Sequence, residues 1–293
     1  MRSRILMMIA ILSTILISCS QYDDQQELFA QDETSEILAK AESFNDSLLS
    51  IKGTTSRGFL SKFARFCAIA GADVAGAYEC GKIGGAVGTV GGPTGTVAGA
   101  AIGGLIGGVG ASYTAHRSTR NEDFIPIERV VCGYTAVKLE EDVLIDTYPQ
   151  KIKLKLPEEA ISLQEIGLKH NLILKKLQET SDLSPDINQI LTPIEKEVLS
   201  SSAFVEQYNL TLNKSSNFLE YSKAQSNDVD DRLMSMYLNL FLNFPDKLDD
   251  VEFISNKYIE MIQNDDSFSE LEKGILYQAI CVAAYSIEFW SEE

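Results

Sequence analysis

The chain has 293 residues, 45% of them hydrophobic and 23% charged, which is enough for one or two domains with a sizeable core. Asp and Glu number 42 against 25 Lys and Arg, and a net charge of −17 argues against nucleic-acid binding, which needs a basic surface. Five cysteines and two histidines exclude a zinc-finger array or a multi-histidine metal centre.

Residues 1–18 have the organisation of a signal peptide. Two arginines precede a mostly apolar run at residues 5–16, which is too short to span a membrane as a mature helix. Residues 16–19, Leu-Ile-Ser-Cys, resemble the lipobox of bacterial lipoproteins. The resemblance implies cleavage before Cys19 and acylation of its thiol with palmitate-type chains, which anchor the mature chain. An ordinary signal peptide with a chance cysteine is the alternative.

Residues 19–33 form a polar, acidic tether. Its first residues resemble the acidic export signal that sends some lipoproteins of Gram-negative gut anaerobes to the cell surface. The resemblance implies a lipid-anchored protein of the outer membrane, exposed at the cell surface. A solvated tether without an export role accounts for the same composition.

Residues 34–63 are expected to contain a short amphipathic helix, because Ile37, Ala41, Phe44 and Leu48 lie along one helical stripe. Basic side chains outnumber acidic ones in residues 52–120, whereas the segments on both sides are acidic. This asymmetry indicates that the basic module faces a different partner from the rest of the chain.

Residues 64–115 are predicted to form a glycine-zipper helical hairpin. Fifteen of the 20 glycines lie between Gly71 and Gly110, and residues 83–116 contain no charged side chain. Residues four apart share nearly the same helix face, so rows of glycine form a groove that a second helix backbone can approach closely. The predicted turn is at residues 91–93, Gly-Gly-Pro. The predicted packing row consists of Gly84, Gly88, Gly92, Gly95, Gly99, Gly103 and Gly107.

This stretch resembles the glycine-zipper domains of envelope proteins and the GxxxG-rich segments of two-peptide bacteriocins. Bacteriocins carry a double-glycine leader, whereas this chain has a lipobox. The resemblance implies close helix packing at a membrane. A glycine-rich helical pair buried inside a soluble protein, or a flexible loop, are the alternatives.

The rest of the chain is expected to be mainly α, with short β-strands only at 124–156, where Val, Ile and Tyr are frequent and residues 151–156 alternate with period two. Residues 157–293 show 3-4 spacing of apolar side chains and are predicted to form an acidic antiparallel helical bundle. Capping boxes are predicted to start helices at Thr192 and at Ser267.

No catalytic, metal or cofactor site is predicted. His170 lies on an apolar stripe and is interpreted as a core histidine, and helix capping accounts for Asp228 and Asp231 better than a calcium site does. Export permits disulfides, and the candidates are Cys132 with Cys281 or a bridge that joins a hairpin cysteine, Cys67 or Cys80, to the rest of the chain. Free buried thiols explain the same cysteines equally well.

Two functional hypotheses follow. In the first, a lipid-anchored envelope protein inserts its hairpin into a membrane, or oligomerises there with further copies of itself, in its sharper form as an antagonistic membrane-active protein. In the alternative, the helical bundle of a soluble-domain lipoprotein binds a protein or glycan partner and the hairpin only packs against it. Neither hypothesis makes the chain an enzyme.

Overall fold

The computed structural model describes residues 36–51, 62–118, 125–139, 151–180, 190–215 and 228–292. The predicted signal peptide, Cys19 and the acidic tether lie outside these residues. The described part of the chain is mainly α-helical, as predicted. A first helix occupies residues 36–51, followed by α2 (Lys62–Gly88), η1 (Thr89–Gly91), α3 (Gly92–Ser118), α4 (Ile127–Leu139), η2 (Glu158–Leu163), α6 (Gln164–Glu179), α8 (Pro193–Ser200), α9 (Ser202–Ser215), α11 (Val229–Asn243), α12 (Leu248–Gln263) and α13 (Glu270–Glu292).

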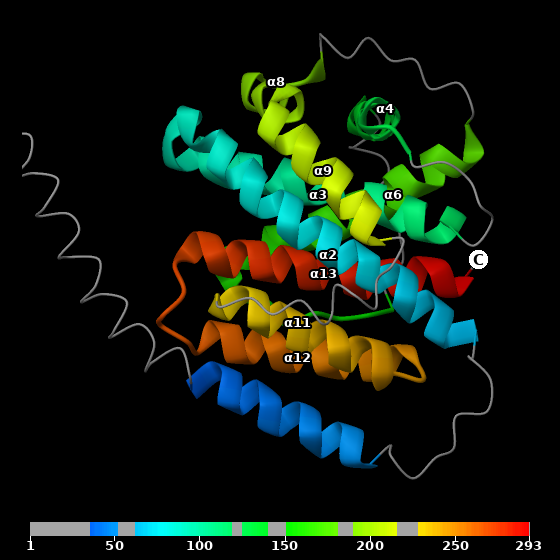
Figure 1. Ribbon diagram of the computed structural model, residues 1–293, viewed down its shortest axis with the longest axis vertical. Helices are drawn as coiled ribbons and strands as arrows, with labels where there is room; N and C mark the ends of the chain where they lie inside the picture. The colour runs from blue at the N-terminus through cyan, green and yellow to red at the C-terminus, as the bar shows by residue number, and fades with distance from the viewer. Residues whose placement is uncertain are drawn as a thin grey trace, which may run out of the picture.

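A hairpin of α2 and α3 lies at the centre of the molecule. The two helices are antiparallel and joined by the single 3₁₀ turn η1 (Figure 1). Helices α13 and α9 pack on α2, and α6 and α8 pack on α3. Residues of the hairpin and of the surrounding helices belong to one hydrophobic core.

Helices α11 and α12 and the helix at 36–51 form a further layer beyond α13 (Figure 1). The first helix packs on this layer through the apolar stripe predicted from the sequence, since Ile37 and Ala41 of that stripe are buried. One polar side chain secures it. Asn45 donates from Nδ2 to the Met236 carbonyl at 2.9 Å and accepts from the Tyr258 hydroxyl at 3.0 Å.

The strands predicted in 124–156 are wrong for the part of that segment that the structure describes. Residues 127–139 form α4, and no residue of 125–139 or 151–156 is assigned to a strand. The Val, Ile and Tyr residues that favour a strand also lie at helical spacing, and Val130, Tyr134 and Val137 are all buried. Burial of one helical face outweighs the small intrinsic preference of β-branched residues for strands.

Residues 151–156 are extended and alternate between buried and exposed side chains, but they pair with no strand. Ile152 is buried and the lysines on both sides of it are exposed. Its N–H donates to the Glu288 carboxylate of α13 at 3.3 Å, and the N–H of Lys155 donates to Asn256 Oδ1 of α12 at 2.7 Å. Side chains of two helices therefore satisfy backbone groups that a neighbouring strand would otherwise pair.

Both predicted capping boxes correspond to helix starts. At Thr192 the reciprocal hydrogen bonds with Glu195 are present, with Pro193 in the first helical position. The second box is shifted by two residues from its predicted place. Ser269, not Ser267, exchanges hydrogen bonds with Glu272 and precedes α13.

Candidate functional site

The two arms of the hairpin touch through their backbones. An added Cβ at Gly84 would lie 2.2 Å from the Gly99 carbonyl oxygen, and one at Gly99 would lie 2.2 Å from the Gly84 carbonyl oxygen. Nothing larger than hydrogen fits between these two positions, because the obstacle is backbone and cannot rotate away. Glycine at both sites is therefore what permits this helix separation.

Six of the seven glycines predicted to pack lie in this seam. An added Cβ at any of the six would lie within 2.5 Å of an atom of the opposite arm. Besides Gly84 and Gly99, they are Gly88, Gly95, Gly103 and Gly107. The seam row on α2 extends further than predicted, since Gly76 faces the Gly107 carbonyl. Gly76, Cys80 and Gly84 are each four residues apart, so they lie on the same face of α2. This spacing is the sequence feature from which the seam position of Gly76 could have been predicted.

Gly92 does not belong to the seam, and its predicted packing role is wrong. No atom lies within 4 Å of an added Cβ there, and its φ of +69° is the one positive glycine φ among the described residues. It sits at the junction between η1 and α3. A left-handed backbone at a tight turn favours glycine because it lacks a Cβ.

Glycines on the other faces of α3 meet helices outside the hairpin. Gly104 faces the Gln278 side chain of α13, Gly108 faces His170 of α6, and Gly110 faces Tyr208 of α9. The absence of side chains thus lets neighbours approach α3 from several directions. In this folded state the glycines serve packing within the protein as well as between the two arms.

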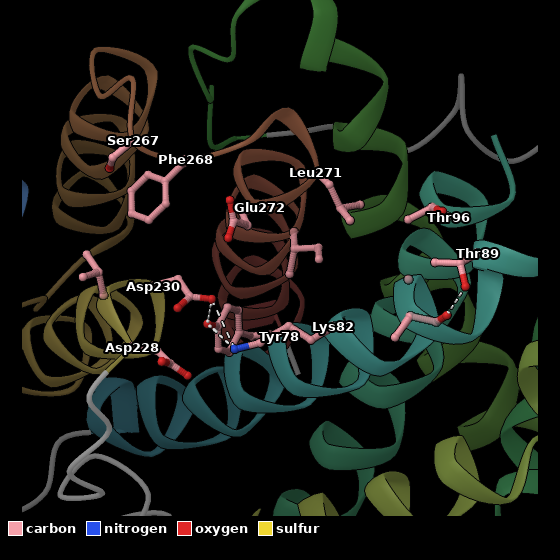
Figure 2. A pocket seen from close by; sticks show the side chains of 14 residues that line it. Tyr78, Lys82, Thr89, Thr96, Asp228, Asp230, Ser267, Phe268, Leu271 and Glu272 are labelled. Atoms are coloured by element: carbon pink, nitrogen blue, oxygen red, sulfur yellow. Dashed lines mark hydrogen bonds and ion pairs between the residues drawn. The ribbon is translucent and has the colours of Figure 1, made fainter. Parts of the chain in front are cut away.

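Where the hairpin turns, a cavity of about 540 Å³ opens between α2, α11 and α13 (Figure 2). Lys82 lies at one side of it, with Nζ 2.9 Å from Asp231 Oδ1 and 3.2 Å from Asp230 Oδ2. The Tyr78 hydroxyl donates toward the same two carboxylates, at 2.6 Å each. Apolar side chains of α13, among them Leu271, form the opposite wall.

The positions of Asp228 and Asp231 at the start of α11 agree with the capping role expected from the sequence. Lys82 of α2 is paired with Asp230 and Asp231 of α11. These two acids lie in the first turn of α11, and Asp228 is its N-cap residue without a side-chain capping bond. Within the described residues, no group of His, Cys, Asp and Glu side chains is arranged to hold a metal ion.

A second polar group lies deep in the core. Ser286 of α13 donates to Asp73 of α2, and His170 Nε2 lies 3.8 Å from the same Asp73 oxygen. His170 is fully buried, as the apolar stripe predicted, and its burial lowers its pKa to about 4. The histidine does not stand between serine and carboxylate, so the group lacks the order of a Ser–His–Asp relay.

All four cysteines of the described residues are free thiols, so the candidate Cys132–Cys281 disulfide is absent from this structure. Helix α6 contacts both α13, which carries Cys281, and α4, which carries Cys132. Cys281 of α13 lies against Gly167, while α4, which carries Cys132, packs near Ile173 and Leu177. Helix α6 therefore lies between them.

The described residues contain one helical stretch, Phe63–Arg117, that is long and apolar enough to cross a membrane. Most of it is buried inside the protein, and core helices of soluble proteins meet the same criterion. Comparison of the chain with protein-family models, with curated proteins and with solved structures found no match.

Proposed function

We propose that the chain is a lipid-anchored envelope protein whose hairpin inserts into or oligomerises at a membrane, and that the surrounding helices cover it until then. The observation that carries this proposal is the side-chain-free seam between the two arms, together with the absence of charge over residues 83–116, which comprise most of α3 and the last residues of α2. Each arm satisfies its own backbone hydrogen bonds, and the seam needs no water, so the pair can move as a unit into lipid.

Polar contacts hold the hairpin inside the bundle, which makes the proposed insertion conditional. Lys82 is bound to the two carboxylates of α11, and Gln278 of α13 donates to the Ala101 carbonyl at 3.1 Å. These groups must separate before the arms can leave. Each arm has 27 residues and therefore spans about 40 Å, long enough to reach across a hydrocarbon core.

The alternative is a lipoprotein whose helical domain binds a protein or glycan partner while the hairpin stays in the core. The cavity of about 540 Å³ favours it, because charged groups such as Lys82 and Asp230 lie there beside apolar walls. Such a mixture suits a partner that is held by both hydrogen bonds and apolar contact.

The two functions are separated by weakening the ion pairs that hold the hairpin. The mature chain with Cys19→Ser is mixed with dye-filled vesicles, alone and with Asp230→Asn and Asp231→Asn combined. We expect the double variant to release dye and to resist carbonate extraction more than its parent, because Lys82 loses both carboxylates.

The control removes one carboxylate charge from an exposed ion pair elsewhere. Glu260→Gln breaks an exposed pair with Lys257 on α12 and should leave dye release unchanged. If neither the parent nor the double variant associates with vesicles while both stay folded, the membrane proposal fails and the binding alternative stands.

A further inference from the structure

The turn end of the hairpin is the exposed part of an otherwise buried element. Residues 89–98, here called the hairpin tip, contain no charged side chain. Val90 is 72% exposed and Val97 is 59% exposed, and Pro93 between them is exposed as well. The tip therefore offers water a small apolar surface that the fold does not cover.

The described chain begins on the same side of the molecule as the hairpin tip, with the ends of α13 and α12 between the two (Figure 1). Figure 1 shows the helix at 36–51 starting on the side to which the tip points. The segment between α12 and α13 reaches the tip, since Ser267 and Phe268 line the cavity of about 540 Å³ together with Thr89. Cys19 lies 17 residues before the first described residue, a length of chain that reaches roughly 60 Å at most.

We propose that the hairpin tip is the surface by which the folded protein lies against a lipid bilayer, and that this bilayer surface is zwitterionic. The inference rests on the proposed function, because it needs the acyl anchor at Cys19 to bring this end of the molecule to the membrane. A short tether raises the effective concentration of the tip at the bilayer, so a small apolar contact suffices to orient the molecule.

Charge decides between lipid classes. The tip itself has no cation for an anionic headgroup, and the second cavity beside Val97 is lined by two acids, Glu159 and Glu270, against one base, Lys273. The chain as a whole carries −17, which an anionic surface repels. The arginines that the sequence places next to the hairpin, Arg65 and Arg117, lie at its opposite end, about 40 Å away by helix length.

The test places an environment-sensitive dye on the tip of the membrane-held protein. Val90→Cys is made in the mature chain with Cys19→Ser and Cys132→Ser, labelled with a nitrobenzoxadiazole dye, and held on phosphatidylcholine vesicles by an N-terminal histidine tag and a chelating lipid. The matched control is Ile51→Cys, because Ile51 is also 72% exposed but lies at the other end of its helix.

The dye at position 90 is expected to brighten at least twofold and to be quenched by spin-labelled lipid, while the dye at position 51 stays unchanged. Adding Val97→Asp should abolish the response at 90, whereas Leu139→Asp, at a site 66% exposed, should preserve it. No response at 90, an equal response at 51, or a response that requires anionic lipid overturns the inference. A response to higher protein concentration without vesicles also overturns it, in favour of a second copy.

Failure of this inference and failure of the proposed function give different results. Dye release from vesicles by the chain with Asp230→Asn and Asp231→Asn, without a response at position 90, leaves the proposed function standing and removes the tip contact. A response at 90 without dye release or insertion in any variant confirms the tip contact and removes the insertion step.

Discussion

His170 is fully buried, and its Nδ1 lies in hydrogen-bond contact with Asn171 Oδ1 at 3.1 Å. Burial disfavours the protonated ring and lowers its pKa from the ordinary 6.5 to about 4. The unfolded chain therefore binds a proton at this residue between pH 6.5 and 4, whereas the folded chain does not. The contribution of His170 to the free energy of unfolding is therefore fully present above pH 6.5 and is lost as the pH falls toward 4.

Replacing His170 by Gln should remove this part of the pH dependence. The native protein is expected to lose roughly 3 kcal/mol of unfolding free energy through His170 between pH 6.5 and 4. Urea unfolding at pH 7, 6, 5 and 4.5 measures the difference between native and variant at each pH. Parallel stability curves for the two proteins would show that His170 does not titrate in this way.

At the scale of the hairpin, the seam predicts opposite effects for two glycine-to-alanine changes. Gly99→Ala places a methyl group 2.2 Å from the Gly84 carbonyl oxygen, so the arms must separate, at an expected cost of about 1–3 kcal/mol. Gly274→Ala on α13 meets no atom within 4 Å and should add about 0.5–1 kcal/mol, because alanine stabilises a helix interior.

Chemical denaturation of both variants beside the parent chain tests this pair. The two residues are both helical glycines, so intrinsic helix propensity favours alanine equally at each. A Gly99→Ala variant as stable as the parent would mean that the arms do not touch through their backbones.

The extended segment at 151–156 shows how an element is decided by distant residues. Its alternation of lysine with apolar residues, from which strands were wrongly predicted, matches the burial of the side chains, since Ile152 and Leu154 are buried. The pattern does not indicate which groups accept hydrogen bonds from the backbone N–H groups of this segment. Glu288, 3% exposed and 136 residues further along the chain than Ile152, supplies such an acceptor, and only folding brings it there.

At the scale of the whole molecule, the four free cysteines predict how the protein reacts with thiol reagents. In the mature chain with Cys19→Ser, four thiols should react in denaturant. Only Cys132 should react in the folded protein, since the other three are buried. Burial and the neighbouring Glu128 raise the pKa of Cys132, so its reaction should be slow at pH 7 and faster above pH 9.

A count with a chromogenic disulfide reagent, before and after adding guanidinium, is the measurement. Two thiols in denaturant rather than four would indicate a disulfide. Cys132 and Cys281 would be the first pair to examine, although α6 stands between their helices.

The molecule has one core rather than a separate hairpin and bundle. Its centre is the segment that the sequence marks as poorest in charge, and the acidic excess lies in the chain around it. Helix α3 is contacted by α2, α13, α6 and α9, because glycines occur on several of its faces. The same glycines that indicate packing in a membrane therefore also allow dense packing between helices inside a folded protein core.

Local sequence patterns predicted most of the helices, the hairpin and its turn, the burial of His170 and every seam glycine named here except Gly76, but they wrongly added Gly92 to the packing row. These features follow from periodicity and turn chemistry, which act over a few residues. Packing between distant segments makes α4 a helix, joins Lys82 to Asp230 and Asp231, and encloses the hairpin with its tip exposed. It also brings side chains of α12 and α13 to the backbone of residues 151–156. Each of these depends on groups far apart in the chain, whose meeting no local pattern encodes.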